Sequence, residues 1–389
     1  MTSVCKKKHG QYFTSNIHLQ NKIYEFILND PKIILEPCVG RGDLVDFILQ
    51  KKSKCKFDMY EIDKNLSILQ SLNNYSNKII YGDFLKLNIN KFYKTIIGNP
   101  PYIRTKNGNL YIDFIKKCFN LLEDKGELIF IVPSDFFKLT SSSKLIELMM
   151  KDGTFTHIFH PHDEKMFENA IIDIIIFRYC KNASLEKKVK YYNNSKLSTK
   201  FIQNNSGLIT FFSKENKNNL LFKDLFNIYV GMVTGNESVF KNSELGNIDV
   251  LNGKNILQKY IFIESFPTNN TKINDYLNKN KSVLLKRKIR KFDEHNWFEW
   301  GAPRNIKTIQ CNLNKECIYI NTITRNDKVA FLGKVNYFSG QLIMLLPKKK
   351  CNLNKIINYL NSDLFKENFI FSGRFKIGHR QISNSNILI

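Results

Sequence analysis

The sequence predicts an α/β fold built on a doubly wound, mostly parallel sheet of seven strands, followed by a C-terminal α+β domain. Three observations support this prediction. Short apolar runs alternate with helical patterns between residues 17 and 177, which is typical of a parallel sheet. The runs are almost continuously apolar, as in strands that are covered on both faces. After about residue 216 the alternation is lost.

The expected strands are short apolar runs, in chain order Ile33–Leu35, Phe57–Tyr60, Ile79–Tyr81, Thr95–Ile97, Glu127–Val132, Thr156–Phe159 and Ile171–Phe177. Apolar residues three or four positions apart predict helices between them, around 17–27, 44–48 and 112–122. These elements place a first domain at residues 1–185.

The rest of the chain is expected to form a connecting segment and a second domain. Residues 186–215 are polar and rich in Lys and Asn, so they are interpreted as the connection. Residues 216–389 hold isolated β-like runs at 228–230, 317–320 and 342–346, and a helix near 353–365. This mixture favours an α+β domain.

Charge indicates a polyanionic partner. The 389 residues include 59 Lys and Arg against 35 Asp and Glu, a formal net charge of +24. Such an excess favours nucleic acid or a membrane surface, although AT-rich coding also enriches Lys and Asn. The hydrophobic fraction of 43% excludes global disorder.

The cysteines and histidines predict neither disulfides nor a metal site. The eight cysteines are scattered without a C-x-x-C pair, and His157, His160 and His162 lack further paired ligands. No secretory h-region and no apolar run of membrane-spanning length occurs. A cytoplasmic protein with reduced thiols, no metal and no membrane contact is therefore expected.

Glycines and carboxylates at three successive strand ends indicate a nucleoside site. The first strand leads into Glu36-Pro37-Cys38-Val39-Gly40-Arg41-Gly42, where glycines allow the backbone to approach a ligand, although a lone turn of this kind is often only structural. Glu61, about 20 residues later, is placed to bind ribose hydroxyls. Asp83 could accept a hydrogen bond from an adenine amine, with Phe84 against the ring.

The segment Asn99-Pro100-Pro101-Tyr102 follows the fourth strand. Two prolines remove two backbone donors and make the turn rigid. The Asn99 amide oxygen and the Pro100 carbonyl could both accept from one incoming NH2 group, and Tyr102 offers a flat face for stacking. An ordinary Pro-Pro turn is the alternative, but it does not explain the position beside a nucleoside site.

Together these motifs resemble the gamma-class, TaqI-like DNA adenine N6-methyltransferases of type II restriction-modification systems. Gly10-Gln11-Tyr12-Phe13-Thr14 is similar to their first cofactor motif, with Ser15 where Pro is common. The resemblance implies a Rossmann-like methyltransferase domain that uses S-adenosylmethionine. It assigns the cofactor contacts to Phe13, Thr14, Glu36, Pro37, Cys38, Gly40, Gly42, Glu61, Ile62, Asp83, Phe84 and Asn99.

The family also places an aromatic residue before the last strand, where it stacks on a flipped base. Met166-Phe167-Glu168-Asn169-Ala170 matches this context, so the resemblance implies that Phe167 joins the catalytic residues Asn99, Pro100, Pro101 and Tyr102. A core phenylalanine is the alternative.

The C-terminal domain resembles the family's target-recognition domain at 230–236, 297–305 and 373–379. Basic residues interleaved with aromatic ones are typical of nucleic-acid contacts. The predicted DNA-binding residues are Lys286, Arg287, Lys288, Arg290, Trp297, Trp300, Arg304, Arg374, Lys376 and Arg380.

The expected reaction is methyl transfer from S-adenosylmethionine to N6 of a flipped-out adenine in duplex DNA. Three alternatives remain: N4-cytosine methylation, glutamine N5-methylation of a protein, and an inactive DNA-binding relative. Asn99 and the order of the motifs favour adenine over cytosine, and the basic C-terminal domain argues against a protein substrate. The protein is expected to act as a monomer, and a separate cognate restriction endonuclease could accompany it.

Overall fold

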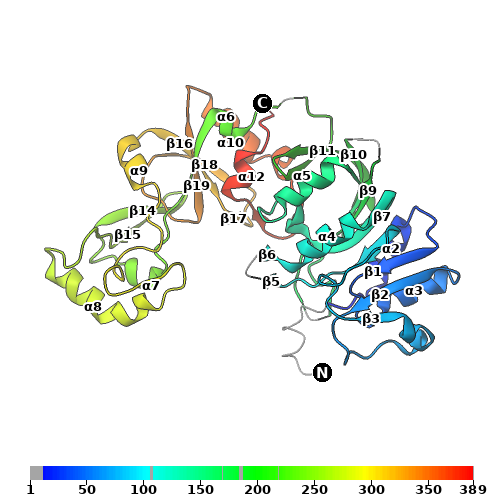
Figure 1. Cartoon of the computed structure of the whole chain (residues 1–389). Helices are drawn as coiled ribbons and strands as arrows, with labels where there is room; N and C mark the ends of the chain where they lie inside the picture. The colour runs from blue at the N-terminus through cyan, green and yellow to red at the C-terminus, as the bar shows by residue number, and fades with distance from the viewer. Residues whose placement is uncertain (1–11, 106–107, 169, 184–186, 218, 389) are drawn as a thin grey trace. The chain divides into compact units, whose positions relative to one another are not determined.

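The computed structural model describes residues 12–105, 108–168, 170–183, 187–217 and 219–388. The chain forms two compact units (Figure 1). The N-terminal unit comprises Met1–Lys217 and Glu367–Ser372, and the C-terminal unit comprises Asn218–Lys366 and Gly373–Ile389. A short stretch near the end of the chain thus belongs to the N-terminal unit.

A ten-stranded sheet forms the centre of the N-terminal unit. Its order is β12 (Leu208–Phe212), β11 (Lys196–Asn205), β10 (Lys188–Asn193), β8 (Gly153–His160), β9 (Ile174–Lys181), β7 (Leu122–Pro133), β4 (Tyr93–Gly98), β1 (Ile33–Glu36), β2 (Lys56–Glu61) and β3 (Ile79–Tyr81). Strands β3, β2, β1, β4 and β7 are mutually parallel, and β9 runs antiparallel between β7 and β8. The predicted doubly wound fold is confirmed, and all seven expected strands are present.

Three further strands differ from the expectation. Residues 186–215 were expected to connect two domains, but β10 pairs in parallel with β8, and β11 and β12 extend the sheet as antiparallel neighbours. In β10, the buried side chains of Val189 and Tyr191 alternate with exposed or half-buried ones. The high Lys and Asn content hid this period-two pattern from the sequence interpretation.

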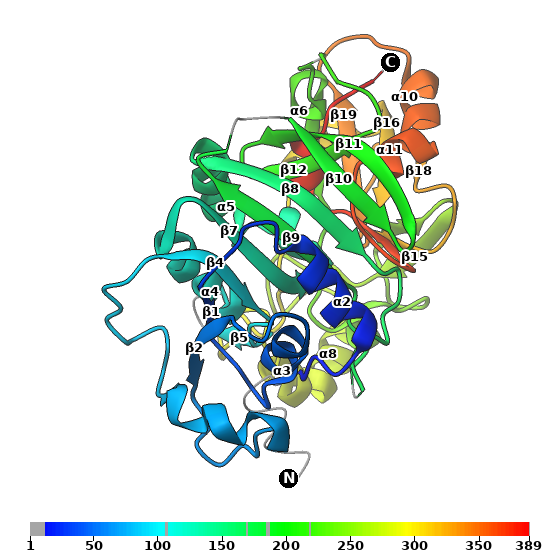
Figure 2. The same cartoon turned by 90° about the vertical axis from the view of Figure 1, so that its right-hand side faces the viewer.

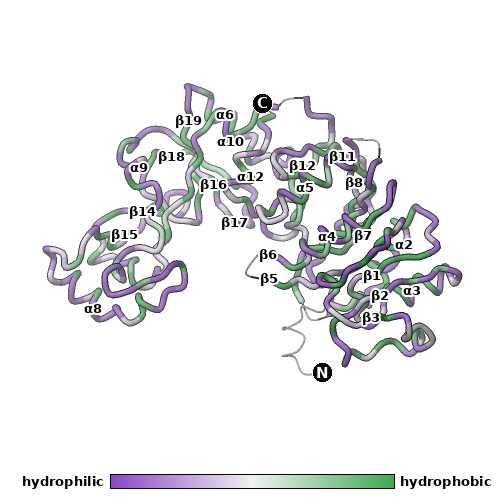
Figure 3. Tube along the Cα trace, viewed as in Figure 1, coloured by the Kyte–Doolittle hydropathy of each residue, from purple (hydrophilic) through white to green (hydrophobic). Residues whose placement is uncertain are grey.

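Helices cover both faces of the sheet (Figure 2). On one face, α2 (Ile17–Phe26) and α3 (Asp43–Lys51) pack against the sheet through buried residues such as Ile23 and Ile48. On the other face, α4 (Leu110–Asn120) and α5 (Ser143–Lys151) bury residues such as Ile115 and Ile146. The 3-10 helices η1 (Gln70–Lys78) and η2 (Ser134–Phe137) and the short hairpin of β5 (Arg104–Thr105) and β6 (Gly108–Asn109) complete this unit. Figure 3 shows hydrophobic stretches along the strands between hydrophilic connections.

A buried carboxylate ties several elements together. Glu127 in β7 is fully buried and accepts four hydrogen bonds, from the backbone N–H groups of Leu28 and Asn29, the Thr95 hydroxyl and the Arg178 guanidinium. The ion pair with Arg178 is 2.8 Å long. Because every acceptor position of the carboxylate is used, it fixes the loop after α2 against β4, β7 and β9.

The C-terminal unit has the predicted α+β character. Its antiparallel sheet has the order β13 (Phe226–Val230), β19 (Leu342–Pro347), β16 (Glu316–Asn321) and β18 (Ala330–Lys334). Two small sheets pair β14 (Ile248–Gly253) with β15 (Ile256–Tyr260) and β17 (Ile323–Thr324) with β20 (Phe375–Lys376). The helices are α6 (Phe222–Leu225), α7 (Glu237–Phe240), α8 (Thr271–Leu285), α9 (Ile306–Asn312), α10 (Leu353–Leu360), α11 (Asp363–Lys366) and α12 (His379–Ser383).

The stretch Glu367–Ser372, called here the returning segment, is an integral part of the N-terminal unit. Ile370 is buried in the main apolar cluster of that unit, and its carbonyl accepts a hydrogen bond from the Lys138 ammonium at 3.1 Å. The backbone N–H of Phe211 donates to the carbonyl of Asn368 at 3.0 Å.

Among the described residues, no helix combines the length and apolarity that a membrane span requires.

Candidate active site

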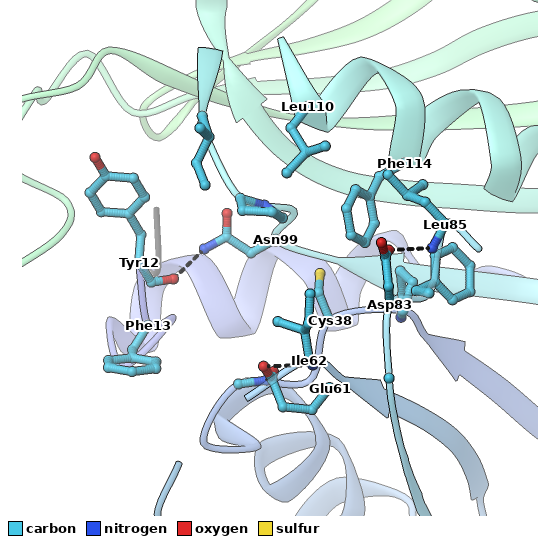
Figure 4. Close-up of a pocket in the computed structure, with 16 residues that line it drawn as sticks. Tyr12, Phe13, Cys38, Glu61, Ile62, Asp83, Leu85, Asn99, Leu110 and Phe114 are labelled. Atoms are coloured by element: carbon cyan, nitrogen blue, oxygen red, sulfur yellow. Dashed lines mark hydrogen bonds between the residues drawn. The ribbon is translucent and has the colours of Figure 1, made fainter. Parts of the chain in front are cut away.

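A pocket of about 850 Å³, including its open mouth, lies at the carboxyl ends of β1 to β4 (Figure 4). Carboxyl ends of parallel strands are where doubly wound folds bind their ligands. Nine of the predicted cofactor residues line the pocket: Phe13, Pro37, Cys38, Gly40, Glu61, Ile62, Asp83, Phe84 and Asn99. Thr14, Glu36 and Gly42 lie outside its lining, and Gly10 and Gln11 of the first motif lie outside the described residues.

The glycine turn after β1 has two distinct requirements. Gly40 has a φ of +59° and its N–H donates to the Glu61 carboxylate at 2.8 Å, so the turn brings bare backbone to the pocket. Gly42 has a φ of +92°, and a Cβ there would lie 2.2 Å from the Leu72 side chain. Gly40 therefore shapes the pocket, whereas Gly42 leaves room for the Leu72 side chain to pack against the turn.

Glu61 is held as a fixed acceptor. One carboxylate oxygen accepts from Gly40, and the other accepts from the N–H groups of Ile62 and Asp63, both at 2.9 Å. A carboxylate offers about four acceptor positions, so three bonds leave capacity for a hydroxyl group. The neighbouring Ile62 side chain is 56% exposed. A carboxylate beside an exposed apolar side chain fits a nucleoside, which has hydroxyls and a flat ring.

The end of β3 supplies the second carboxylate. Asp83 accepts from the N–H of Leu85 at 3.1 Å and pairs with the ammonium of Lys86 at 3.3 Å. The ring of Phe84 is buried and stacks on Phe114, with 5.6 Å between ring centroids. Phe84 therefore contributes to the pocket wall mainly as a member of the core, while Asp83 remains available at the rim.

The first motif forms the opposite wall. The guanidinium of Arg41 lies 4.5 Å from the centroid of the Phe13 ring and pairs with Asp43 at 3.0 Å. A cation over an aromatic face is attractive, so Arg41 holds the ring beside Gly40. Thr14 is 4% exposed, and its carbonyl accepts from the Gln20 side chain at 2.9 Å.

Burial disfavours the charged forms of the groups behind the turn. Burial raises the pKa of Glu36 well above its ordinary range, and one of its carboxyl oxygens has no hydrogen-bond partner among the described residues. Burial also raises the pKa of the Cys38 thiol, and the Glu36 carboxyl adds to the effect. A thiol that stays protonated is a poor nucleophile, so Cys38 is better suited to packing than to covalent catalysis.

Asn99 is oriented by two hydrogen bonds at the end of β4. Its Nδ2 donates to the carbonyl of Tyr12 at 2.7 Å and to the hydroxyl of Thr14 at 3.1 Å. A carbonyl can only accept, so the NH2 must face Tyr12 and Oδ1 must face the other way. Oδ1 accepts from the Tyr102 hydroxyl at 2.6 Å.

Tyr102 belongs to an aromatic cluster with Tyr12, Tyr111 and Phe167. The Tyr12 and Tyr102 rings are stacked, with centroids 5.3 Å apart, and Phe167 lies 6.2 Å from Tyr102 and 5.5 Å from Tyr12. The structure thus brings Asn99, Tyr102 and the predicted stacking residue Phe167 together beside the pocket. Phe167 itself is only 5% exposed.

Asp173 anchors the loop that carries Phe167. Its carboxylate binds His160 at 2.7 Å, the Ser134 hydroxyl at 2.5 Å and the N–H of Ser372 at 3.0 Å. Burial raises the pKa of Asp173, but these hydrogen bonds outweigh it and leave the pKa below its ordinary value. The loop before β9 is therefore tied to the ends of β7 and β8 and to the returning segment.

Some of the predicted DNA-binding residues are buried. Trp297 and Trp300 are each 2% exposed, and the Trp300 indole donates to the carbonyl of Ile261. Arg287 is 8% exposed and donates to the carbonyls of Leu284, Thr234, Glu299 and Trp297. These three side chains hold the C-terminal unit together and offer no surface for DNA in this conformation.

The remaining basic residues keep accessible surface. Lys286, Lys288, Arg304, Arg374 and Lys376 are exposed and Arg380 is half-buried. Arg290 is also exposed, although its guanidinium pairs with Glu299. These are the predicted DNA-binding residues whose side chains remain accessible.

Several pocket and cluster residues were missed from the sequence. Ile103, Leu110 and Phe114 line the pocket but have only the apolar spacing of ordinary core residues. Asp173 had a detectable signal, because it interrupts the apolar run 171–177. Tyr12 was part of the first motif, but its contact with Tyr102 joins residues 90 positions apart.

Comparison with known proteins shows similarity to methyltransferases. Residues 44–167 match the family described as Eco57I restriction-modification methylase. Type II methyltransferase M.HincII of Haemophilus influenzae is 28% identical over 199 residues, which cover 46% of this chain and 38% of that protein. M.AccI of Acinetobacter calcoaceticus is 25% identical over 215 residues, covering 48% and 39%. The chain thus spans about two fifths of these relatives.

Two further similarities concern a ribosomal RNA methyltransferase and a solved structure. Ribosomal RNA small subunit methyltransferase A of Mesomycoplasma hyopneumoniae (strain 232) is 37% identical over 136 residues, covering 34% of this chain and 49% of that protein. The DNA complex of the type IIL restriction-modification enzyme MmeI has a TM-score of 0.61, with 11% identity, over 98% of this chain and 65% of that one. At this identity the likeness concerns the fold. The chain is therefore similar to restriction-modification methyltransferases over about half of its length, and S-adenosylmethionine is the cofactor that this similarity implies.

Proposed function

We propose that the protein is a site-specific DNA methyltransferase that modifies N6 of an adenine flipped out of duplex DNA. The observation that carries the proposal is the orientation of Asn99. Its NH2 group is tied to Tyr12 and Thr14 at the wall of the cofactor pocket, so its carbonyl oxygen is turned toward Tyr102. An amide oxygen between a cofactor pocket and an aromatic cluster suits a planar exocyclic amine.

The chemistry requires an acceptor of this kind. When bound, S-adenosylmethionine supplies an electrophilic methyl group. The lone pair of the adenine amine is delocalised into the ring, and hydrogen bonds from that amine to Asn99 Oδ1 and the Pro100 carbonyl would localise it. Catalysis then depends on positioning and electrostatics and needs no covalent intermediate.

The Tyr102 hydroxyl can release the acceptor without moving its ring. The hydroxyl oxygen lies 2.6 Å from Asn99 Oδ1 and 3.1 Å from the carbonyl of Ile131. Burial raises the pKa of Tyr102 well above its ordinary value, so the hydroxyl keeps its single proton. Rotation of that proton toward Ile131 would free Asn99 Oδ1 for the base.

Stacking would offset the cost of flipping. Taking a base out of the duplex costs a few kcal/mol. Aromatic side chains contribute roughly 1–3 kcal/mol per stacked base in related systems. Tyr102 and Phe167 are the residues proposed for this role, with centroids 6.2 Å apart.

DNA is the partner that the charge supports. The net charge of +24 and the exposed residues Lys286, Lys288, Arg304, Arg374 and Lys376 suit a phosphate backbone. Two of the matched relatives, M.HincII and M.AccI, are type II methyltransferases, and MmeI was solved with DNA. We propose that the protein acts in the cytoplasm as a monomer. A separate cognate endonuclease could accompany it.

The test is the identity of the methylated nucleoside. Unmethylated plasmid DNA is incubated with the purified chain and isotopically labelled S-adenosylmethionine, digested to nucleosides and analysed by mass spectrometry. The label is expected in N6-methyladenine, and single-molecule sequencing then maps the site. Label in N4-methylcytosine, or no label in the DNA, would overturn the assignment.

A further inference from the structure

The place proposed for the target base is filled by a side chain of the protein itself. The Tyr12 and Tyr102 rings are inclined by only 29° with centroids 5.3 Å apart, so Tyr12 covers one face of Tyr102. Tyr12 also lies 5.5 Å from Phe167. Stacked aromatic rings have centroids about 4.5–7 Å apart, so a base on this face would overlap the Tyr12 ring.

The hydrogen-bond acceptor proposed for the base is occupied as well. Asn99 Oδ1 receives the Tyr102 hydroxyl at 2.6 Å. The other end of the same amide holds the Tyr12 carbonyl at 2.7 Å. One face of Tyr102 is therefore covered, and the acceptor Asn99 Oδ1 is occupied. The Asn99 amide contacts both the Tyr102 hydroxyl and the Tyr12 carbonyl.

Tyr12 differs from the other rings around Tyr102. Tyr111 and Phe167 are 2% and 5% exposed, and each is embedded in an apolar cluster. Tyr12 is half-buried and lies at the rim of the cofactor pocket. Of these three described neighbours, Tyr12 can therefore leave Tyr102 with the least disturbance of the core.

We propose that Tyr12 is a stand-in for the target base, and that the base enters by exchanging places with the Tyr12 ring. This inference rests on the proposed function. The ring covers one face of Tyr102 in the DNA-free protein, so the base must compete with it to enter. An aromatic pair of this kind corresponds to about a 2- to 12-fold change in an equilibrium constant. Loss of the ring should therefore favour the flipped base by a factor of that size.

The experiment uses a duplex with the mapped recognition site and 2-aminopurine at the target adenine. Binding and the rise in fluorescence are measured for the wild-type chain, Tyr12→Ala and Tyr24→Ala. Tyr24 is a matched control, because it is also half-buried and packs on a phenylalanine, Phe47, at 6.4 Å. Tyr12→Ala is expected to bind about 3- to 10-fold more tightly, while Tyr24→Ala is expected to be unchanged.

Unchanged or weaker binding by Tyr12→Ala would overturn the exchange, and weaker binding would make Tyr12 a partner of the base. If Tyr12→Ala does not fold, as judged by circular dichroism, Tyr12→Leu takes its place with the same expectations. A second readout is the indole emission of Tyr12→Trp, which should become more accessible to acrylamide when DNA is added; no change would contradict the exchange. Failure of the proposed function is distinguishable, because the wild-type chain would then yield no methylated adenine.

Discussion

Replacement of Asn99 by alanine removes two roles of one side chain, the proposed acceptor for the base and the anchor of the segment at Tyr12. Asn99→Ala removes Oδ1, the acceptor proposed for the adenine amine. It also removes the two Nδ2 bonds to Tyr12 and Thr14, at 2.7 and 3.1 Å. The first loss should act on turnover and the second on the cofactor pocket.

The two losses have different magnitudes. Removing one preorganised electrostatic contact to a transition state typically costs 10²–10³ in turnover, about 3–4 kcal/mol. Two neutral hydrogen bonds contribute about 1 kcal/mol each, which corresponds to an increase in KM for S-adenosylmethionine of up to about 30-fold. We therefore expect kcat to fall at least 100-fold, with cofactor binding weakened but measurable.

Thr14→Val is the matched control, because it removes one of the Nδ2 contacts and leaves Oδ1 in place. Its kcat is expected to stay within about 10-fold of wild type. Initial rates of labelled methyl transfer to plasmid DNA, at varied cofactor concentration, give kcat and KM for all three proteins. Near-wild-type turnover in Asn99→Ala would refute the acceptor role. An equal loss in Thr14→Val would show that Asn99 acts only by holding the segment at Tyr12.

Three further predictions concern packing and charge. Phe167→Leu keeps an apolar side chain but no ring, so it should lower the 2-aminopurine fluorescence rise; an unchanged rise would make Phe167 simply a core residue. Glu127→Gln should lower the unfolding free energy in urea by about 3–5 kcal/mol, because Arg178 stays buried without its partner. The control Lys91→Ala breaks the ion pair of the exposed Lys91 with Asp58 and should cost under about 1 kcal/mol. Equal effects of the two changes would contradict this prediction. Burial, with Arg178 and a nearby lysine, lowers the pKa of His157 to about 4. Below pH 6.5 the unfolded chain therefore binds more protons than the folded chain. Between pH 7 and pH 5 the wild-type protein should lose about 2 kcal/mol more unfolding free energy in urea than His157→Gln. Equal losses in the two proteins would contradict the prediction.

The sequence predicted the parts of the site that depend on strand ends. Glu61 and Asp83 follow β2 and β3, and parallel strands present their carboxyl ends at one edge, so the spacing alone brought these carboxylates to the pocket. Asn99 was predicted for the same reason. The local sequence predicts the placement of these side chains, because each strand and the turn that follows it are contiguous in the chain.

Other features could not be predicted because they depend on distant partners. Trp297 and Trp300 alternate with basic residues as in a nucleic-acid surface, yet both are buried, since an aromatic side chain serves a core and an interface equally well. Glu36 has no sequence signal for its raised pKa, which comes from burial. The position of the Tyr12 ring follows from its contacts with Tyr102 and Phe167, which lie far from it in the sequence.

The returning segment has a consequence for how such proteins are cut and recombined. A chain truncated after residue 217 would keep every strand of the large sheet, yet it would lose Ile370 from the apolar cluster and the Ser372 N–H from Asp173. Exchange of the whole C-terminal part between homologues would import a foreign piece into the catalytic core. A chimaera that swaps 219–366 together with 373–389, and keeps 367–372 native, preserves that core and, under the proposed function, is the better route to altered DNA specificity.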